Sequence, residues 1–372
     1  MNKFLINRGL IGQLDFIMII TAILITIFGI MNIYSVTYSN LGFYYAKLQF
    51  LWLIIGLIIV YFILVFDYNS LGRYSKLIYW SGIALLLFND VTSRAVKGAS
   101  SWIRLGNRAI EPGEFVKFGL ILIIAKKLDD MEGNVNKPKN FIIVSLYAAI
   151  PMFLILIQPN LGMTLICFFI TLGMYFISDL NLEILKIGFL SAIPLSLIIW
   201  FSGLLKTYQK DRILVFLNPD AYQQDAGFQL MQSIISIGSG GFWGAGFLKG
   251  VHAPGGFIPE VHTDFIFAIV GEEWGLLGSI FLLILYSILI YRMIKIAKES
   301  KDIMGRLICV GTASGFLFSI FQNIGMTIGL MPVAGITLPF MSYGGSSILV
   351  NFMSLGLVLN VGMRKNKIIF KK

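Results

Sequence analysis

The sequence predicts an all-α polytopic membrane protein with about ten transmembrane helices. Of its 372 residues, 57% are hydrophobic and only 13% are charged, whereas a soluble domain usually carries about 25% charged residues. The mean hydropathy is +0.83, and the apolar runs are many and long enough to cross the hydrocarbon core of a bilayer. We therefore expect one membrane domain over residues 1–372 rather than several globular domains.

The apolar segments define the expected helices in chain order. The third is short and the fourth begins with charged residues, so these two depart most from an ordinary span. The first opens with Asp15 and has no small-residue cleavage site, which indicates a span rather than a cleaved signal. The segments are 14–36, 48–66, 74–89, 113–128, 140–157, 161–178, 184–202, 264–294, 307–330 and 345–363.

The basic residues indicate the orientation of these spans. Ten crossings put both termini on one side, and that side carries about twice as many Lys and Arg as the other. Cytoplasmic loops are enriched in these residues, so we expect both termini in the cytoplasm. The net charge of +10 is then a topology signal and a contact with anionic membrane lipids, and we expect no nucleic acid as a partner.

Two outward segments carry unusual sequence. Residues 90–112 hold Arg94, Lys97, Arg104 and Arg108 on the side that should be poor in basic residues, so either an anionic ligand or outer-leaflet headgroups would explain them. Residues 203–263 form a long extracytoplasmic loop between helices 7 and 8, and loops of this length usually have a function. Its glycine-rich part matches no nucleotide-binding motif.

A third outward segment, residues 331–344, has two prolines and no charge. It is either a candidate wall of a site, because irregular backbone at membrane depth must be buried or line a cavity, or a simple helix connection. In the second case, Ser346 or Ser347 would cap the following helix.

Ionisable residues at the mouths of the spans are candidate functional groups. Glu114 and Lys117 lie three residues apart, so they share a helix face and can form either a structural ion pair or the lining of a polar cavity. Asp264 begins the long eighth segment, where it could cap the helix, act in a site near the outer headgroups, or do both. On an α-helix, Glu272 would be rotated about 80° from Asp264 and could flank the same cavity, whereas Glu273 would face the opposite way.

A metal site of conventional type is not predicted. His252, Glu260, His262 and Asp264 lie close in sequence, but their spacing matches no metal-binding signature. The two cysteines, Cys167 and Cys309, lie in apolar runs without ligand spacing, so we interpret both as packing residues.

Seven motifs, in order along nearly the whole chain, resemble the SEDS family (shape, elongation, division and sporulation). They are KGASSWIRLG (97–106), EPGEFVKFGLILIIAKKL (111–128), QPNLGMTL (158–165), RILVFLNP (212–219), GFQLMQSIISIGSGGFWGAGF (227–247), PEVHTDFIFAIVGEEWG (259–275) and NIGMTIGLMPVAGITLPFMSYGGSS (323–347). The last motif begins with NIGMTIGLMP, a sequence that is more similar to the RodA-like elongation branch than to the division branch.

The resemblance implies a bacterial cytoplasmic-membrane glycosyltransferase that polymerises lipid II into peptidoglycan strands, with a class B penicillin-binding protein as partner. It assigns the essential aspartate to Asp264, the charged pair to Glu114 and Lys117, and the loop tryptophan to Trp102. Lys97, Arg104 and Arg212 become candidates to bind the substrate diphosphate. Asp264 would act as general base or hold a divalent cation, Mg²⁺ or Mn²⁺.

Four positions depart from the family pattern. Glu111 and Gly113 replace the glutamine and serine of the common QPSE, Asn160 replaces a common acid, and Ser101 stands where arginine is frequent. The alternatives to the polymerase are a lipid II flippase, a scaffold for a partner enzyme, or the division or sporulation member of the same family. A flippase would require polar groups through the full depth of the membrane and commonly shows internal repeats. No repeat is visible, and the charged candidates cluster at one side.

Overall fold

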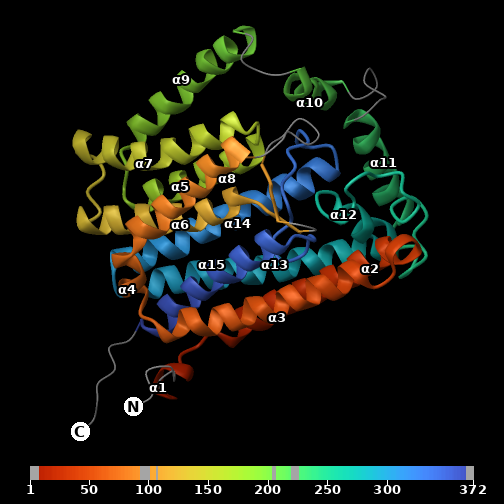
Figure 1. Cartoon of the computed structure of the whole chain (residues 1–372), viewed down its shortest axis with the longest axis horizontal. Coiled ribbons are helices and arrows are strands. Elements are labelled where there is room, and N and C mark those ends of the chain that lie inside the picture. Colours follow the sequence, from red (N-terminus) through yellow and green to blue (C-terminus); the bar gives the residue numbers. More distant parts are fainter. Residues whose placement is uncertain (1–7, 93–100, 106–107, 203–206, 219–225, 366–372) are drawn as a thin grey trace.

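The computed structural model describes residues 8–92, 101–105, 108–202, 207–218 and 226–365, and these residues are predominantly helical (Figure 1). The helices that precede the long outward loop are α1 (Arg8–Ile11), α2 (Phe16–Leu41), α3 (Tyr44–Val65), α4 (Tyr68–Arg73), α5 (Ser75–Thr92), α6 (Pro112–Asp130), α7 (Pro138–Ile157), α8 (Leu161–Ile177) and α9 (Leu182–Phe201). They are followed by α10 (Thr207–Leu217), α11 (Ala226–Ser239), α12 (Ile266–Ile269), the π-helix η2 (Val270–Trp274), α13 (Gly275–Glu299), α14 (Ile303–Thr327) and α15 (Gly345–Met363).

Each of the ten predicted apolar segments contains one of these helices or a consecutive set of them. Among the described residues, six helical stretches are long and apolar enough to cross a membrane. They are Phe16–Tyr38, Tyr44–Val65, Pro138–Ile157, Ile266–Glu299, Ile303–Thr327 and Gly345–Met363. The predicted fold class is therefore confirmed at the level of a helical membrane protein.

The centre of the bundle is formed by α6, α14 and α15, which are surrounded by other helices (Figure 1). α15 packs along α3, α14 packs against α8, and α5 packs against α6. Helices that are buried on all sides read as apolar on all faces, and four polar side chains of α15, those of Ser346, Ser347, Asn351 and Asn360, are hydrogen-bonded. Asn360 shows this, because its Nδ2 donates to the carbonyl oxygens of Ile63 and Phe66 at the end of α3.

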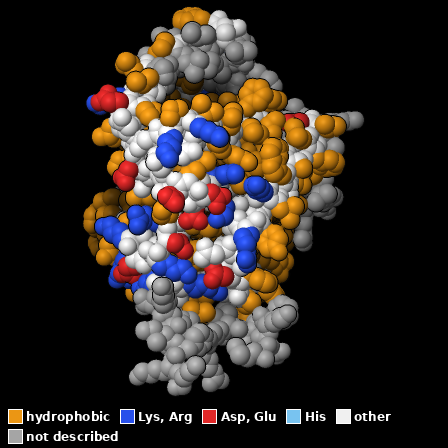
Figure 2. Space-filling view, turned by 90° about the vertical axis from the view of Figure 1, so that its left-hand side faces the viewer, with side chains coloured by type: hydrophobic (Ala, Val, Ile, Leu, Met, Phe, Trp, Pro, Cys, Tyr) orange, Lys and Arg blue, Asp and Glu red, His pale blue; other side chains and the backbone are white. Residues whose placement is uncertain are grey.

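Ion pairs join the helix ends at the side of the bundle where the described chain begins and ends. Asp15 before α2 lies 2.6 Å from Arg292 of α13, and Arg364 after α15 lies 3.6 Å from Asp67 after α3. Figure 2 views this end and shows Lys and Arg intermixed with Asp and Glu, with hydrophobic side chains around them. The two described ends of the chain are therefore held at the same end of the bundle.

The eighth apolar segment is not one continuous α-helix. It starts as α12, passes through the single π-helical turn η2, and continues as α13. The expectation that Glu272 flanks the same cavity as Asp264 is wrong. Its carboxylate instead accepts hydrogen bonds from the backbone N–H groups of Val251, His252 and Ala253 and from the hydroxyl of Ser236.

The long segment before α12 is structured in its described part. It contains α10 and α11, followed by a glycine-rich stretch of turns that packs against η2. Glu273, next to Glu272, is buried and hydrogen-bonded to the hydroxyl of Ser35 on α2. The two glutamates of η2 therefore fasten this segment to the bundle.

Among the described residues, the one departure from the all-α prediction is a small antiparallel pair of strands within the predicted outward segment 90–112. Its strands are β1 (Ile103–Leu105) and β2 (Arg108–Ile110), and Arg104 pairs with Ala109. Strands of three residues are too short to be detected from hydrophobic alternation.

Candidate active site

Asp264 lies just before α12, and its backbone is fixed by a buried amide. Nδ2 of Asn323 on α14 donates to the carbonyl oxygen of Asp264 at 2.8 Å and to that of Ile336 at 2.6 Å. One side chain therefore ties the aspartate to the segment 331–344, although the two are far apart in sequence. A third link is the backbone N–H of Tyr343, which donates to the carbonyl oxygen of His262 at 2.9 Å.

Gly335 is the point at which the two charged candidates meet. Its φ of 64° lies in the left-handed region that favours glycine. A Cβ at this position would lie 3.4 Å from Oδ2 of Asp264 and 4.0 Å from Nη1 of Arg212. The carboxylate and the guanidinium therefore both reach the same small space beside the Gly335 backbone.

A polar pocket continues inward from Gly335 between α6, α8, α14 and α15. Nζ of Lys117 lies 2.6 Å from Oε2 of Glu114, so the predicted pairing is confirmed, and both side chains are buried. Nδ2 of Asn160 donates to Oε1 of Glu111 at 2.9 Å, across from them. The pocket is lined by Glu111, Glu114, Lys117, Asn160, Met163, Ile166, Ser319, Gly335, Ile336, Thr337, Pro339, Ser347 and Asn351.

The pocket contains more acidic than basic groups. Glu111 lies one residue before α6 and is only 8% exposed. Burial, together with the charges of Glu114 and Asp264, raises the pKa of Glu111 to about 8, while Lys117 and the Asn160 hydrogen bond oppose the rise. The influence of Asp264 on Glu111 also indicates that the aspartate and the pocket form one electrostatic unit.

The remaining predicted site residues are not all brought to this pocket. Trp102 is 43% exposed and is not among the side chains that line it. Arg104 lies in β1, where its backbone pairs with that of Ala109. Its side chain lies outside the described part of the structure. Lys97 falls outside the described residues.

Neither proposed helix cap is formed as expected. The residue that precedes α12 is Phe265, and no side chain caps that helix, so capping does not account for Asp264. The residue that precedes α15 is Gly344. The hydroxyl of Ser346 instead accepts from the backbone N–H of Glu111, and Ser347 is hydrogen-bonded to Thr337 at 2.9 Å.

Sequence reasoning missed Ser319 and Asn351 of the pocket, and it considered Ser347 only as a helix cap. Asn351 was the most detectable of them, because it interrupts the apolar run of the last span, and polar residues inside spans usually face the protein interior. The segment 331–344 was recognised as a candidate wall, and Gly335, Ile336, Thr337 and Pro339 do line the pocket.

The described neighbours of Asp264 do not complete the donor set of a metal site. Among the residues that the structure describes, no three His, Cys, Asp or Glu side chains come together in a way that could hold a metal ion. His262 is stacked on Tyr45, with ring centroids 5.0 Å apart, and burial lowers its pKa. A divalent cation at Asp264 would therefore need water and substrate phosphate for most of its ligands, and no step below depends on one.

Comparison with known proteins places this chain in a family. The family described as cell cycle protein, which groups FtsW, RodA and SpoVE, matches residues 14–367. The chain belongs to the FtsW, RodA and SpoVE family. It is thus a multi-pass protein of the bacterial cytoplasmic membrane, in agreement with its apolar helices.

Relatives from several branches of the FtsW, RodA and SpoVE family are similar over almost their full length. Stage V sporulation protein E of Bacillus subtilis is 35% identical over 358 residues, covering 93% of this chain and 96% of the relative. Peptidoglycan glycosyltransferase RodA of Treponema pallidum is 30% identical, with 96% and 99% covered. Peptidoglycan glycosyltransferase MrdB of Escherichia coli is 31% identical, with 94% and 93% covered.

Solved structures of the FtsW, RodA and SpoVE family share the fold. A chain from "Structural coordination of polymerization and crosslinking by a peptidoglycan synthase complex" gives a TM-score of 0.82 at 29% identity, covering 95% of this chain and 99% of that one. The crystal structure of RodA from Thermus thermophilus gives 0.71 at 25% identity, with 95% and 98% covered. The similarity to the sporulation protein and to RodA is comparable, so identity alone does not assign a branch.

Proposed function

We propose that this protein is a peptidoglycan glycosyltransferase that polymerises lipid II into glycan strands at the outer face of the cytoplasmic membrane, in cell elongation and shape maintenance. The observation that carries the proposal is the meeting of Asp264 and Arg212 beside Gly335, at the rim of a buried polar pocket. Relatives that match over nearly their whole length are named peptidoglycan glycosyltransferases. The division and sporulation roles are the alternatives within the family.

The site is proposed to face the outside of the cytoplasmic membrane. Ten spans with both termini in the cytoplasm put the segment 203–263 and Asp264 on the extracytoplasmic side, where the sugars of lipid II are exposed. Asp15 near one described chain end pairs with Arg292, and Arg364 near the other pairs with Asp67, and the position of both pairs at one end of the bundle supports an even number of crossings. The basic residues of that end agree with the positive-inside rule.

In the proposed mechanism, Asp264 is the general base. Its carboxylate accepts the proton of the acceptor sugar 4-hydroxyl as that oxygen bonds to the anomeric carbon of the donor. The bond from that carbon to the lipid diphosphate breaks, and the diphosphate leaves with the electron pair. Arg212, at the same position in the site, balances the charge of the diphosphate, and Lys97 and Arg104 are proposed to add to it.

Glu114, Lys117 and Trp102 are proposed to bind substrate rather than to take part in proton transfer. Lys117 is already paired with Glu114 at 2.6 Å, so the pair offers a polar wall of nearly neutral charge. Trp102, which is 43% exposed, offers an apolar face to a sugar or lipid. A class B penicillin-binding protein is the proposed partner, because the solved relative comes from a peptidoglycan synthase complex.

The test is polymerisation of labelled lipid II by the purified full-length protein, with and without its partner, comparing wild type with Asp264→Asn. Loss of a general base lowers a rate by about 100-fold or more, so we expect Asp264→Asn to make almost no polymer. Glu260→Gln removes an acid four residues away and is the matched control, expected to polymerise like wild type. Equal activity of Asp264→Asn and wild type would exclude the proposed mechanism, and flipping of labelled lipid across vesicles without polymerisation would favour the flippase.

A further inference from the structure

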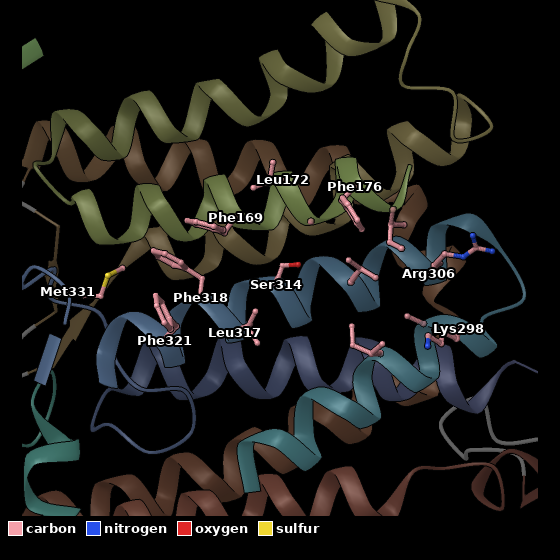
Figure 3. Close-up of a pocket in the computed structure, with 15 residues that line it drawn as sticks. Phe169, Leu172, Phe176, Lys298, Arg306, Ser314, Leu317, Phe318, Phe321 and Met331 are labelled. Atoms are coloured by element: carbon pink, nitrogen blue, oxygen red, sulfur yellow. The ribbon is translucent and has the colours of Figure 1, made fainter. Parts of the chain in front are cut away.

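A second cavity lies on the outside of the bundle, away from Asp264. It is a groove of about 820 Å³ between α8, α13 and α14, which is within the range of roughly 300–1,000 Å³ typical of small-molecule sites. Its walls are mainly aliphatic and aromatic, and Figure 3 shows Phe169, Leu317 and Phe318 among the side chains that line it. Leu317 and Phe321 are 58% and 61% exposed, so the groove is open along the side that faces lipid.

One end of the groove is basic. Lys298 near the end of α13 and Arg306 near the start of α14 line that end, whereas Met331 lies at the other end (Figure 3). Within the described part of the chain, neither side chain takes part in an ion pair, in contrast to Arg292 and Lys365 of the same membrane face. Two cations that form no ion pair with a described residue therefore stand where an apolar groove meets the headgroup zone.

A polar pocket extends the groove at this end. It has a volume of about 280 Å³ and shares Ile177 and Arg306 with the apolar groove, so Arg306 stands between the two. Its other walls include Glu132, Asn134 and Asp179. Because acidic side chains are present as well, this end is not a purely cationic patch, and it suits a phosphate group rather than a headgroup of high negative charge.

We propose that this groove is a binding site for a membrane glycerophospholipid. The acyl chains lie along Phe169, Leu317 and Phe318, and the phosphate is bound by Lys298 and Arg306. An arginine with free donors and a lysine are the side chains that most often bind phosphate, and the apolar length below them excludes a water-soluble phosphate as the intended occupant. With both termini in the cytoplasm, the lipid belongs to the cytoplasmic leaflet, at the opposite membrane face from Asp264.

The test is native mass spectrometry of the purified full-length protein, titrated with four probes: phosphatidylethanolamine, phosphatidylglycerol, diacylglycerol and glycerol phosphate. The first two carry chains and phosphate, the third only chains, and the fourth only phosphate. We expect both phospholipids to bind at one saturable site, diacylglycerol to bind about tenfold more weakly, and glycerol phosphate not to be retained. Saturable binding of diacylglycerol that is as tight as that of the phospholipids would overturn the role of the basic end.

Two matched pairs of variants locate the site. Leu317→Trp fills the groove, and Leu283→Trp makes the same change on a lipid-facing position of α13 outside it. Lys298→Ala/Arg306→Ala removes the basic end, and Lys137→Ala/Lys139→Ala removes two exposed charges elsewhere on the same face. We expect only the first member of each pair to weaken phospholipid binding, by about tenfold.

Equal binding by both members of each pair would show that the lipid is an ordinary annular lipid and would refute the site. All six substituted positions are exposed, so folding is not at risk, and elution as a single species on size exclusion verifies it for each of the four variants. The readout is lipid binding and not polymerisation. It therefore stands or fails independently of the function proposed for Asp264.

Discussion

At the scale of single residues, Glu111 is an acidic group whose surroundings differ strongly from water. Glu111 is buried beside Glu114, whose negative charge is balanced by Lys117. The negative charge of Asp264 also acts on Glu111. Burial raises the pKa of Glu111 to about 8 from an ordinary value of 4.5. In the folded protein near neutral pH this carboxyl therefore holds its proton, which also limits the negative charge next to Asp264.

The raised pKa of Glu111 predicts a pH-dependent stability. The stabilising contribution of the protonated group is complete below about pH 4.5 and is lost as the pH rises through about 8, because the unfolded chain releases this proton more easily. Glu111→Gln keeps a carbonyl acceptor for Asn160 and cannot ionise. We expect its thermal stability to match wild type near pH 5 and to exceed it at pH 8.5 by about 1 kcal/mol or more.

The measurement is the melting temperature of each purified variant across this pH range, with the exposed Glu132→Gln as control. The control curve should run parallel to that of wild type. Superimposable pH profiles for wild type and Glu111→Gln would mean that Glu111 is ionised without cost, contrary to the environment described here.

At the scale of elements, the glycine-rich segment after α11 is fitted to the π-helix η2 by backbone contact. A Cβ on Gly240 would lie 2.0 Å from the carbonyl oxygen of Gly271, which leaves no room for any side chain. The backbone N–H groups of Ala245 and Gly246 donate to the carbonyl oxygens of Glu272 and Glu273. The segment that leads to Asp264 is thus attached to the span by close backbone packing.

This packing predicts opposite effects of two neighbouring substitutions. Gly240→Ala should destabilise the protein by about 1–3 kcal/mol, since backbone must move to admit the methyl group. Gly238→Ala meets nothing within 4 Å and lies inside α11, where alanine is favoured over glycine, so it should be neutral or slightly stabilising. Melting temperature and limited proteolysis of the segment 240–262 measure the difference, and equal behaviour of the two variants would disprove the proposed fit.

At the scale of the whole molecule, hydropathy was sufficient to predict the long helices of the bundle, but not the short helices α4 and α10. The ten apolar segments correspond to helices because each must satisfy its own backbone hydrogen bonds in lipid, whatever its neighbours are. The Glu114–Lys117 pair was predictable for a similar reason, since its spacing is local. Asp264 and the wall 331–344 were recognised as candidates from their position in the chain.

The contacts that assemble the site could not be predicted in the same way. The link from Asn323 to Asp264, the meeting of Arg212 with Gly335, and the capture of the loop by Glu272 all join residues that are distant in sequence. They depend on how helices pack, and packing of apolar surfaces in lipid leaves little trace in composition. The π-helical turn was missed because its residues have no distinctive hydropathy.

The proposed orientation predicts which face of the membrane each exposed residue reaches. Both native cysteines are buried, so wild type serves as the unlabelled background. With a membrane-impermeant maleimide on intact spheroplasts, we expect Trp243→Cys to be labelled at once and Lys139→Cys only after permeabilisation. The reverse pattern would place Asp264 in the cytoplasm and rule out synthesis at the outer face.

The π-helical turn η2 also makes the length of the eighth span matter. A π-helical turn holds about one residue more than an α-helical turn, so η2 takes up one residue while the helices on either side stay nearly in phase. A regular α-helix over the same residues would rotate everything on the N-terminal side by about 100° relative to α13. Asp264 would then turn away from Gly335 without any change in its own identity. The wide turn therefore sets the direction of the carboxylate, and an inserted or deleted residue elsewhere in the span, with no such turn to absorb it, would disconnect the carboxylate from the pocket.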